Sequence, residues 1–289
     1  MQQHEIDRRQ NSFGTLLKQW RDLRSFSQLD LALTSQVSQR HISFLESGRA
    51  KPSQEMVLKL ATVLEIPLRQ QNLMLSAAGF APMHSETDLS APEMSPVRKA
   101  IDLMLRQHEP YPAFVVDRYW NLILTNNGTT RLLDAFIDRD KMHALFYTDG
   151  KINLMRALFH PQGLRPFIVN WESFIDHLLQ RLHRETLVER EGDKSTLLLN
   201  ELMSYPDVAI IWQTANRNVQ NTLLLNIHLQ RDDLELKFFT TIATLGTPYD
   251  ITLQELRIEL QFPADAATER NWQNYLNSRS FSRTISEDV

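Results

Sequence analysis

Hydrophobic residues follow a helical period through the first eighty positions of the chain. Apolar side chains at 13, 16, 17, 20 and 23 form one stripe, which predicts a helix over 13–23. Ser27, Ser38 and Ser53 stand where N-caps belong, and Gly48, Pro67 and Gly79 stand where helices end. The pattern predicts five helices, at 13–23, 28–34, 39–47, 54–64 and 68–78.

The pattern changes after residue 96. Helical stripes recur at 126–136, 152–159, 171–189 and 196–203, while 113–116 and 120–125 are predicted as two strands joined by a turn. In 225–230, 234–238 and 256–262 apolar and polar residues alternate, which indicates antiparallel strands with one buried and one wet face. On the last of these strands, Arg257, Glu259 and Gln261 are expected on the wet face.

These elements predict an α+β protein of two domains. An all-α, five-helix domain occupies residues 1–80, and a linker with three prolines and no apolar period occupies 81–96. An antiparallel sheet with covering helices follows over 97–277, and a polar tail over 278–289 is expected to be flexible.

Composition removes several classes of protein. The chain has no cysteine, which excludes disulfides, thiolate metal sites and cysteine nucleophiles. The eight glycines are never closer than thirteen positions, whereas phosphate-binding loops and nucleophile elbows need glycines within about six. We expect no catalytic residue, no metal site and no cofactor other than a bound effector, and the absence of a leader or an apolar span predicts a cytoplasmic protein without membrane contact.

Charge is divided unevenly. Residues 1–82 carry ten Lys or Arg against seven Asp or Glu, and the remainder carries twenty-one against twenty-eight. A basic N-terminal domain on an acidic body is expected if only that domain meets a polyanion, although an excess of three charges also arises by chance.

The second and third predicted helices form a helix-turn-helix. Leu31, Ala32, Val37, Ile42 and Leu45 can meet in one small core, which leaves Gln39, Arg40, Ser43 and Phe44 on the outer face. Amide and guanidinium groups at the start of such a helix suit contacts with adenine and guanine edges.

The segments 27–33, 37–48 and 51–53 resemble the lambda-repressor-like (XRE) DNA-binding domain. The resemblance implies that Gln28 holds a phosphate, that Gln39, Arg40 and Phe44 face bases, and that Arg49 and Lys51 meet the backbone. The turn position that this family usually gives to glycine is Gln36, which must adopt a left-handed conformation or a different turn. The expected DNA-binding residues are Gln28, Ser38, Gln39, Arg40, His41, Ser43, Phe44, Arg49 and Lys51.

Four of these residues have a simpler alternative. Gln28 is also consistent with a solvated helix position, and Phe44 with packing against the fifth helix. Arg49 and Lys51 are also consistent with ordinary surface charge.

Segments of the second half, among them 112–126, 153–161 and 244–257, resemble the MmyB-like ligand-binding domain, a PAS-like module. The resemblance covers about 96–265 and implies a small-molecule sensor with long-chain fatty acids as a precedent ligand class. The expected ligand-binding residues are Phe114, Val116, Leu122, Asn126, Leu133, Phe136, Arg156, Leu158, Phe159, His160, Trp171, Phe174, Leu178, Arg181 and Arg184. The apolar members would wall a cavity, and the basic members would fix a carboxylate, but an ordinary core with surface ion pairs gives the same pattern.

The sequence therefore predicts a DNA-binding transcriptional regulator. We expect a homodimer on a double-stranded DNA operator, whose affinity changes when a small, apolar acid binds the C-terminal domain. The alternative is a ligand-independent DNA-binding protein whose C-terminal domain serves dimerisation or partner binding.

Overall fold

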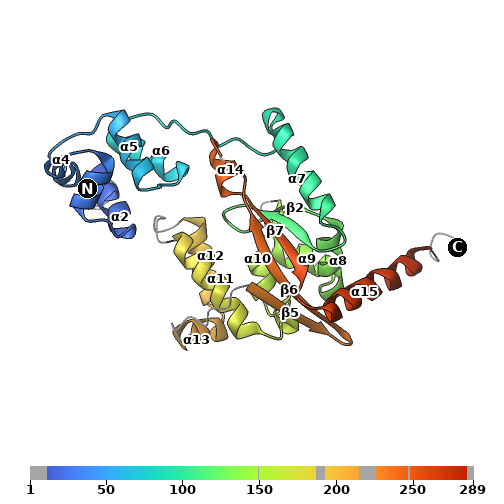
Figure 1. Ribbon diagram of the computed structural model, residues 1–289. Coiled ribbons are helices and arrows are strands. Elements are labelled where there is room, and N and C mark those ends of the chain that lie inside the picture. The colour runs from blue at the N-terminus through green and yellow to red at the C-terminus, as the bar shows by residue number, and fades with distance from the viewer. Residues whose placement is uncertain (1–11, 149, 187–192, 215–224, 247, 285–289) are drawn as a thin grey trace. The chain divides into compact units, whose positions relative to one another are not determined.

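The computed structural model describes residues 12–148, 150–186, 193–214, 225–246 and 248–284. The chain separates into two compact units (Figure 1). The first comprises Met1–Met94 together with Leu245–Gln254, and the second comprises Ser95–Thr244 and Glu255–Val289. A short segment from far along the chain therefore belongs to the N-terminal unit.

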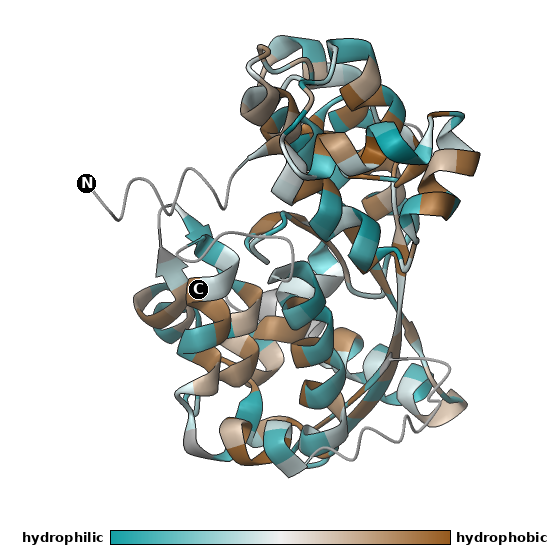
Figure 2. Cartoon of the chain, turned by 90° about the vertical axis from the view of Figure 1, so that its left-hand side faces the viewer, coloured by the Kyte–Doolittle hydropathy of each residue, from teal (hydrophilic) through white to brown (hydrophobic). Residues whose placement is uncertain are grey.

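The N-terminal unit contains the five predicted helices, which are confirmed to within one residue at each end. They are α2 (Phe13–Leu23), α3 (Gln28–Ser35), α4 (Gln39–Glu46), α5 (Gln54–Val63) and α6 (Leu68–Ala78). Hydrophobic and hydrophilic stretches alternate along individual helices, as expected where each helix buries one face (Figure 2).

Local signals begin and end these helices as the sequence predicts. Ser27 and Asp30 form a capping box at α3, with Ser27 Oγ accepting from Asp30 N at 3.1 Å and Asp30 Oδ2 accepting from Ser27 N at 2.9 Å. Ser38 and Ser53 cap α4 and α5. Gln36 ends α3 with φ of 53°, so the turn does use the left-handed conformation in spite of its side chain.

A close approach between α2 and α4 fixes the packing of this unit. A Cβ at Gly14 would lie 2.5 Å from the carbonyl oxygens of Leu45 and Glu46, so only glycine fits there. Leu31, Ile42 and Leu45 are fully buried beside this contact. Of the five residues predicted for the small core between α3 and α4, Leu31, Ala32, Ile42 and Leu45 are buried and Val37 is half-buried.

Hydrogen bonds tie the segment Leu245–Gln254 and the helix α14 (Ile251–Glu255) to this unit. The side-chain Oδ2 of Asp250 accepts from Ser85 Oγ at 2.9 Å and from Thr87 N and Oγ1 at 3.1 and 2.8 Å. Gln254 Oε1 accepts from Leu68 N at 2.7 Å, at the start of α6, where Pro67 offers no side-chain cap.

The second unit is built on a five-stranded antiparallel sheet in the order β2-β1-β7-β6-β5 (Figure 1). Its strands are β1 (Ala113–Val116), β2 (Leu122–Thr125), β5 (Leu225–Arg231), β6 (Leu234–Ala243) and β7 (Arg257–Pro263). The expected antiparallel sheet with covering helices is confirmed. β2 begins later than predicted because Trp120 adopts φ of 65° in the preceding turn.

The helices of this unit are partly those predicted. They are α7 (Ser95–Gln107), α8 (Asn127–Phe136), α9 (Arg139–Phe146), α10 (Leu154–Phe159), α11 (Trp171–Thr186), α12 (Lys194–Met203), α13 (Pro206–Thr214) and α15 (Ala266–Thr284). The unit also has a short 3-10 turn at Arg165–Phe167 and a hairpin of β3 (Tyr147–Thr148) and β4 (Lys151–Ile152), while a 3-10 turn at Pro92–Met94 ends the first unit. Residues 278–284, expected in a flexible tail, continue α15, while 187–189 of the predicted helix 171–189 and 285–289 of the tail lie outside the described residues.

The predicted orientation of β7 is wrong. Glu259 and Gln261 are only 4 % and 8 % exposed, and their register partners Phe114 and Thr240 lie on the same face of the sheet, under α8, α10 and α11. The opposite face is covered as well, since Ile258 is buried there. Because β7 is the central strand, both faces are covered, and alternation alone does not distinguish them.

Candidate functional site

Helix α4 presents two different faces. Ile42 and Leu45 turn into the core, whereas Gln39 and Arg40 are exposed at the helix start and Ser43 and Phe44 are half-buried. Ser38 Oγ accepts from His41 N at 3.2 Å and holds that start in place. The arrangement leaves an amide and a guanidinium group at the exposed N-terminal end of a helix, as reading of base edges requires.

Two arginines flank the ring of Phe44. The guanidinium carbon of Arg40 lies 5.2 Å from the ring centroid, and that of Arg49 lies 6.0 Å from it. Both distances are within the range of cation–π attraction. Arg49 and Lys51 are exposed beyond the end of α4, where Gly48 adopts φ of 70°. Cationic side chains thus cluster on the side of α4 away from the core.

Gln28 is held by a network that the sequence did not reveal. Its Nε2 donates to Glu46 Oε2 at 2.7 Å, and Glu46 in turn accepts from Arg21 Nε at 2.5 Å. Arg21 and Glu46 are nearly buried, and the hydrogen bond to Glu46 raises the pKa of Arg21 above its ordinary value. This network fixes the position of the Gln28 amide relative to α4.

A small cavity of about 50 Å³ lies between the sheet and its helices. Six of the expected ligand-binding residues line it: Phe114, Leu122, Leu133, Leu158, Phe174 and Leu178. The other lining residues were not expected, and they include the aromatic and polar residues Trp120, Thr129, Thr240, Glu259 and Gln261. We call this space the inner cavity.

The other expected apolar residues have structural positions instead. Val116, Phe136 and Phe159 belong to the buried core without lining the inner cavity. The ring of Trp171 packs against Phe159 at 5.5 Å. Asn126 caps α8, since its Oδ1 accepts from Ala113 N and Thr129 N at 3.0 and 2.9 Å.

The four basic residues expected to bind a carboxylate do not converge on one point. Arg156 pairs with Glu201 at 2.8 Å, and Arg184 is exposed on α11. His160 packs against the ring of Phe146 at 5.5 Å and does not line the inner cavity.

Arg181 belongs to a compact group of charges beside the inner cavity. Its guanidinium lies 3.0 Å from Glu259 and 3.6 Å from Glu185, and Arg257 lies 2.7 Å from Glu185. The indole of Trp120 lies beneath both guanidinium groups, at 4.5 Å from Arg181 and 5.0 Å from Arg257. Burial raises the pKa of Glu259 and lowers that of Arg257. The group holds two formal charges of each sign.

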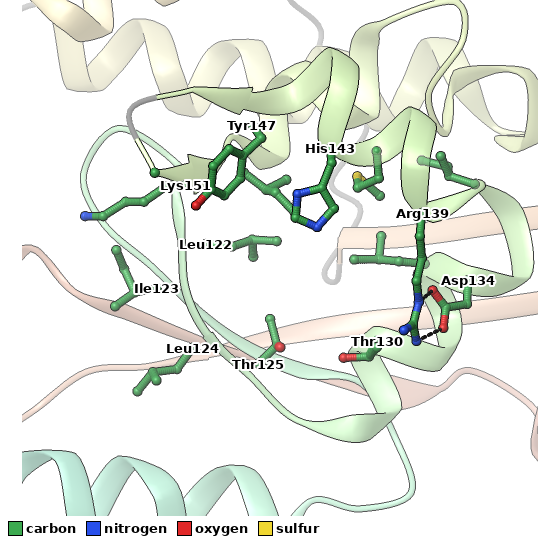
Figure 3. Close-up of a pocket in the computed structure, with 15 residues that line it drawn as sticks. Leu122, Ile123, Leu124, Thr125, Thr130, Asp134, Arg139, His143, Tyr147 and Lys151 are labelled. Carbon is green, nitrogen blue, oxygen red and sulfur yellow. Dashed lines mark hydrogen bonds and ion pairs between the residues drawn. The ribbon is translucent and has the colours of Figure 1, made fainter.

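A larger pocket of about 370 Å³ opens at the edge strand β2 (Figure 3). Residues of β2, α8, α9 and the β3–β4 hairpin line this outer pocket. Its rim carries an ion pair between Arg139 and Asp134, the neighbouring rings of His143 and Tyr147 at 5.2 Å, and Lys151 (Figure 3). Leu122 and Leu133 were expected to bind a ligand, but sequence reasoning missed the rest of this pocket because its residues come from five elements, of which β3 and β4 have only two residues each.

Two further observations bear on the chemistry of the chain. Among the residues that the structure describes, no group of three or more His, Asp or Glu is placed to hold a metal ion. None of the helices in the described segments has the length and apolar composition needed to cross a membrane.

Comparison with known proteins identifies both parts of the chain. Residues 17–71 match the helix-turn-helix family model, and residues 97–273 match the model of the MmyB-like transcription regulator ligand binding domain. No match was found among curated proteins. A solved structure of an RNA-binding light-oxygen-voltage receptor aligns at 10 % identity and a TM-score of 0.24, over 94 % of this chain and 64 % of that chain. Because the second match covers more than half of its 289 residues, the chain belongs to the family of the MmyB-like transcription regulator ligand binding domain, here combined with a helix-turn-helix domain.

Proposed function

We propose that this regulator recognises a specific duplex DNA sequence through α4 and that a small, mainly apolar effector bound by the C-terminal domain changes its affinity for that operator. The observation that carries the DNA-binding part is the division of α4, which buries Ile42 and Leu45 and exposes Gln39 and Arg40 at its start.

Each side chain of this surface has a distinct role. Gln39 and Arg40 contact base edges, and Phe44 contacts a thymine methyl group while it braces the guanidinium of Arg40. Gln28, positioned by Glu46, and the exposed Arg49 and Lys51 contact phosphates. Ser38, His41 and Ser43 complete the surface at the N-terminal part of α4, which enters the major groove of the DNA.

The functional form in this proposal is a homodimer in the cytoplasm. One α4 reads only a few base pairs, and two related by a two-fold axis read half-sites about one helical turn apart. A dimer also gives the effector something to act on, because a change in the spacing of two DNA-binding domains changes operator affinity.

The apolar walls of the inner cavity and the outer pocket support the effector. Fatty acids are the first class to test, because the expected ligand of the C-terminal domain is an apolar acid. An effector acts on DNA binding only if its affinities for the two dimer geometries differ.

The small size of the inner cavity favours a second candidate. With about 50 Å³ of free space the core is nearly filled, which suits a domain that only dimerises or binds a partner. In that case operator binding is independent of small molecules.

Selection of duplexes from a randomised library by the full-length protein tests the proposal. We expect one enriched palindromic sequence, bound more tightly than its scrambled counterpart, and a dimer in native mass spectrometry. Straight-chain acids and the matching alcohols and amides are then titrated while operator affinity is followed. Equal affinity for selected and scrambled duplexes refutes specific recognition, and an operator affinity that no compound alters supports the dimerisation candidate.

A further inference from the structure

The inner cavity and the outer pocket share two lining leucines. Leu122 on β2 and Leu133 on α8 line both spaces. The outer pocket is open to solvent at the β2 edge, where Figure 3 shows Leu122 among the side chains that line it. Rotation of these two side chains would therefore join an open pocket to the interior of the domain.

The volumes assign different parts of a ligand to the two spaces. The outer pocket, at about 370 Å³, has the size of a small-molecule site, whereas the inner cavity, at about 50 Å³, accepts only a small terminal group. A ligand that uses both keeps its body in the outer pocket and inserts one end past Leu122 and Leu133.

One residue that lines the inner cavity carries a buried hydrogen-bond acceptor without a donor. Gln261 lines this cavity and is 8 % exposed, and in the described part of the chain its Oε1 has no hydrogen-bond partner. A buried acceptor in this state costs free energy that a ligand donor recovers. The end group that satisfies Gln261 is therefore one that donates a hydrogen bond.

The charges around the cavity disfavour an ionised end group. The guanidinium groups of Arg181 and Arg257 are already paired with Glu185 and Glu259, and Glu259 itself lines the cavity. These four side chains carry two formal positive and two formal negative charges. An ionised carboxylate would therefore add a negative charge that, among the described residues beside the cavity, no free cation compensates. A neutral hydroxyl or amide adds none.

We infer that the effector is a single-chain molecule with a neutral donor end, a primary alcohol or a primary amide, which passes between Leu122 and Leu133 and donates to Gln261 Oε1. This inference rests on the proposed function and names the ligand class of its effector site.

The test measures binding of decanol, decanamide and decanoate to the full-length protein by calorimetry. The wild type is expected to bind the alcohol and the amide about tenfold more tightly than the carboxylate. Gln261→Met, which removes the amide acceptor at similar length, is expected to abolish that preference, and Gln180→Met on the exposed surface of α11 to preserve it. Circular dichroism checks the fold of each variant.

The leucine partition has its own matched pair of variants. Leu133→Ala opens the partition and is expected to accelerate association of decanol, whereas Leu124→Ala, which shortens a residue of the outer pocket alone, is expected to weaken all three compounds equally. Similar effects of the two variants would overturn the partition.

The outcomes separate this inference from the proposed function. Tighter binding of decanoate than of decanol by the wild type refutes the neutral donor end and leaves the effector in place. Failure of all three compounds to bind refutes the effector site as well.

Discussion

Under the proposed function, single side chains around α4 divide into those that read sequence and those that hold the DNA or the fold. Arg40 and Lys51 are both exposed cations, but only Arg40 projects from the start of the helix. A guanidinium in that place can form two hydrogen bonds with a guanine, whereas a lysine beyond the helix end meets phosphates of any sequence.

Arg40→Ala and Lys51→Ala are therefore expected to differ in kind. Arg40→Ala loses about 1–3 kcal/mol at the selected operator and relaxes base preference at one position. Lys51→Ala weakens selected and scrambled duplexes alike and reduces the slope of log affinity against log salt by about one. Fluorescence anisotropy over a salt series measures both, and an equal loss of Arg40→Ala on both duplexes contradicts base reading.

Arg21 offers a second comparison at this scale, because one of its acidic partners is buried and the other is exposed. The side chain of Glu46 is 5 % exposed and that of Asp22 is 54 % exposed. Glu46→Ala leaves a nearly buried guanidinium without its main partner and is expected to lower the free energy of unfolding by about 3 kcal/mol. Asp22→Ala is expected to cost less than about 1 kcal/mol, and urea unfolding of both variants provides the measurement.

Among the elements, α3 and α4 are each followed by a residue with positive φ, directly after α3 and two positions after α4. Gln36 adopts φ of 53° and Gly48 adopts φ of 70°, and a Cβ at Gly48 would meet nothing within 4 Å. The two positions therefore differ in backbone strain and not in packing.

Exchange of residue types at these two turns is expected to have opposite effects. Gln36→Gly relieves the left-handed strain and is expected to raise the melting temperature. The corresponding gain in the free energy of unfolding is at most about 1 kcal/mol. Gly48→Ala introduces the same strain and lowers stability by about 1 kcal/mol. Calorimetric melting of both variants tests the pair, and loss of stability in Gln36→Gly would show that its side chain contributes more than its backbone costs.

The elements also show how far sequence reasoning reaches. The five N-terminal helices were predictable because local signals bound them: an apolar stripe marks α2, serine N-caps begin α3, α4 and α5, and α6 lies between Pro67 and Gly79. Of the expected ligand-binding residues, six line the inner cavity, whereas Glu259 and Gln261 were expected in solvent. Their burial depends on β7 being the central strand, and strand order is a property of distant pairing. The helix α15 was missed because it lacks a marked apolar stripe.

At the scale of the molecule, Asp250 joins chain segments more than 160 positions apart. Burial raises its pKa, but hydrogen bonds from Thr87 and Ser85 outweigh this effect and leave the pKa below its ordinary value. A carboxyl with a depressed folded-state pKa contributes stability that is present above the unfolded value, near 3.9, and is lost as the pH falls through the folded value.

Asp250→Asn is therefore expected to destabilise the protein most at neutral pH. The difference in unfolding free energy between wild type and variant is expected to be constant above about pH 5 and to shrink below about pH 4. Denaturant unfolding at a series of pH values checks this result. A difference that is constant down to about pH 3 would show that the carboxylate charge has no part in the contact.

The place of α14 has a practical consequence for anyone who dissects this protein. A gene fragment that stops in the linker encodes every helix from α2 to α6, yet it omits Leu245–Gln254, which completes the same unit. Such a truncation exposes Leu68 N at the start of α6 and strips the acceptor from Ser85 and Thr87. The N-terminal unit is thus discontinuous in sequence, and a fragment with Leu245–Gln254 joined after the linker is expected to be more stable than the same fragment without it.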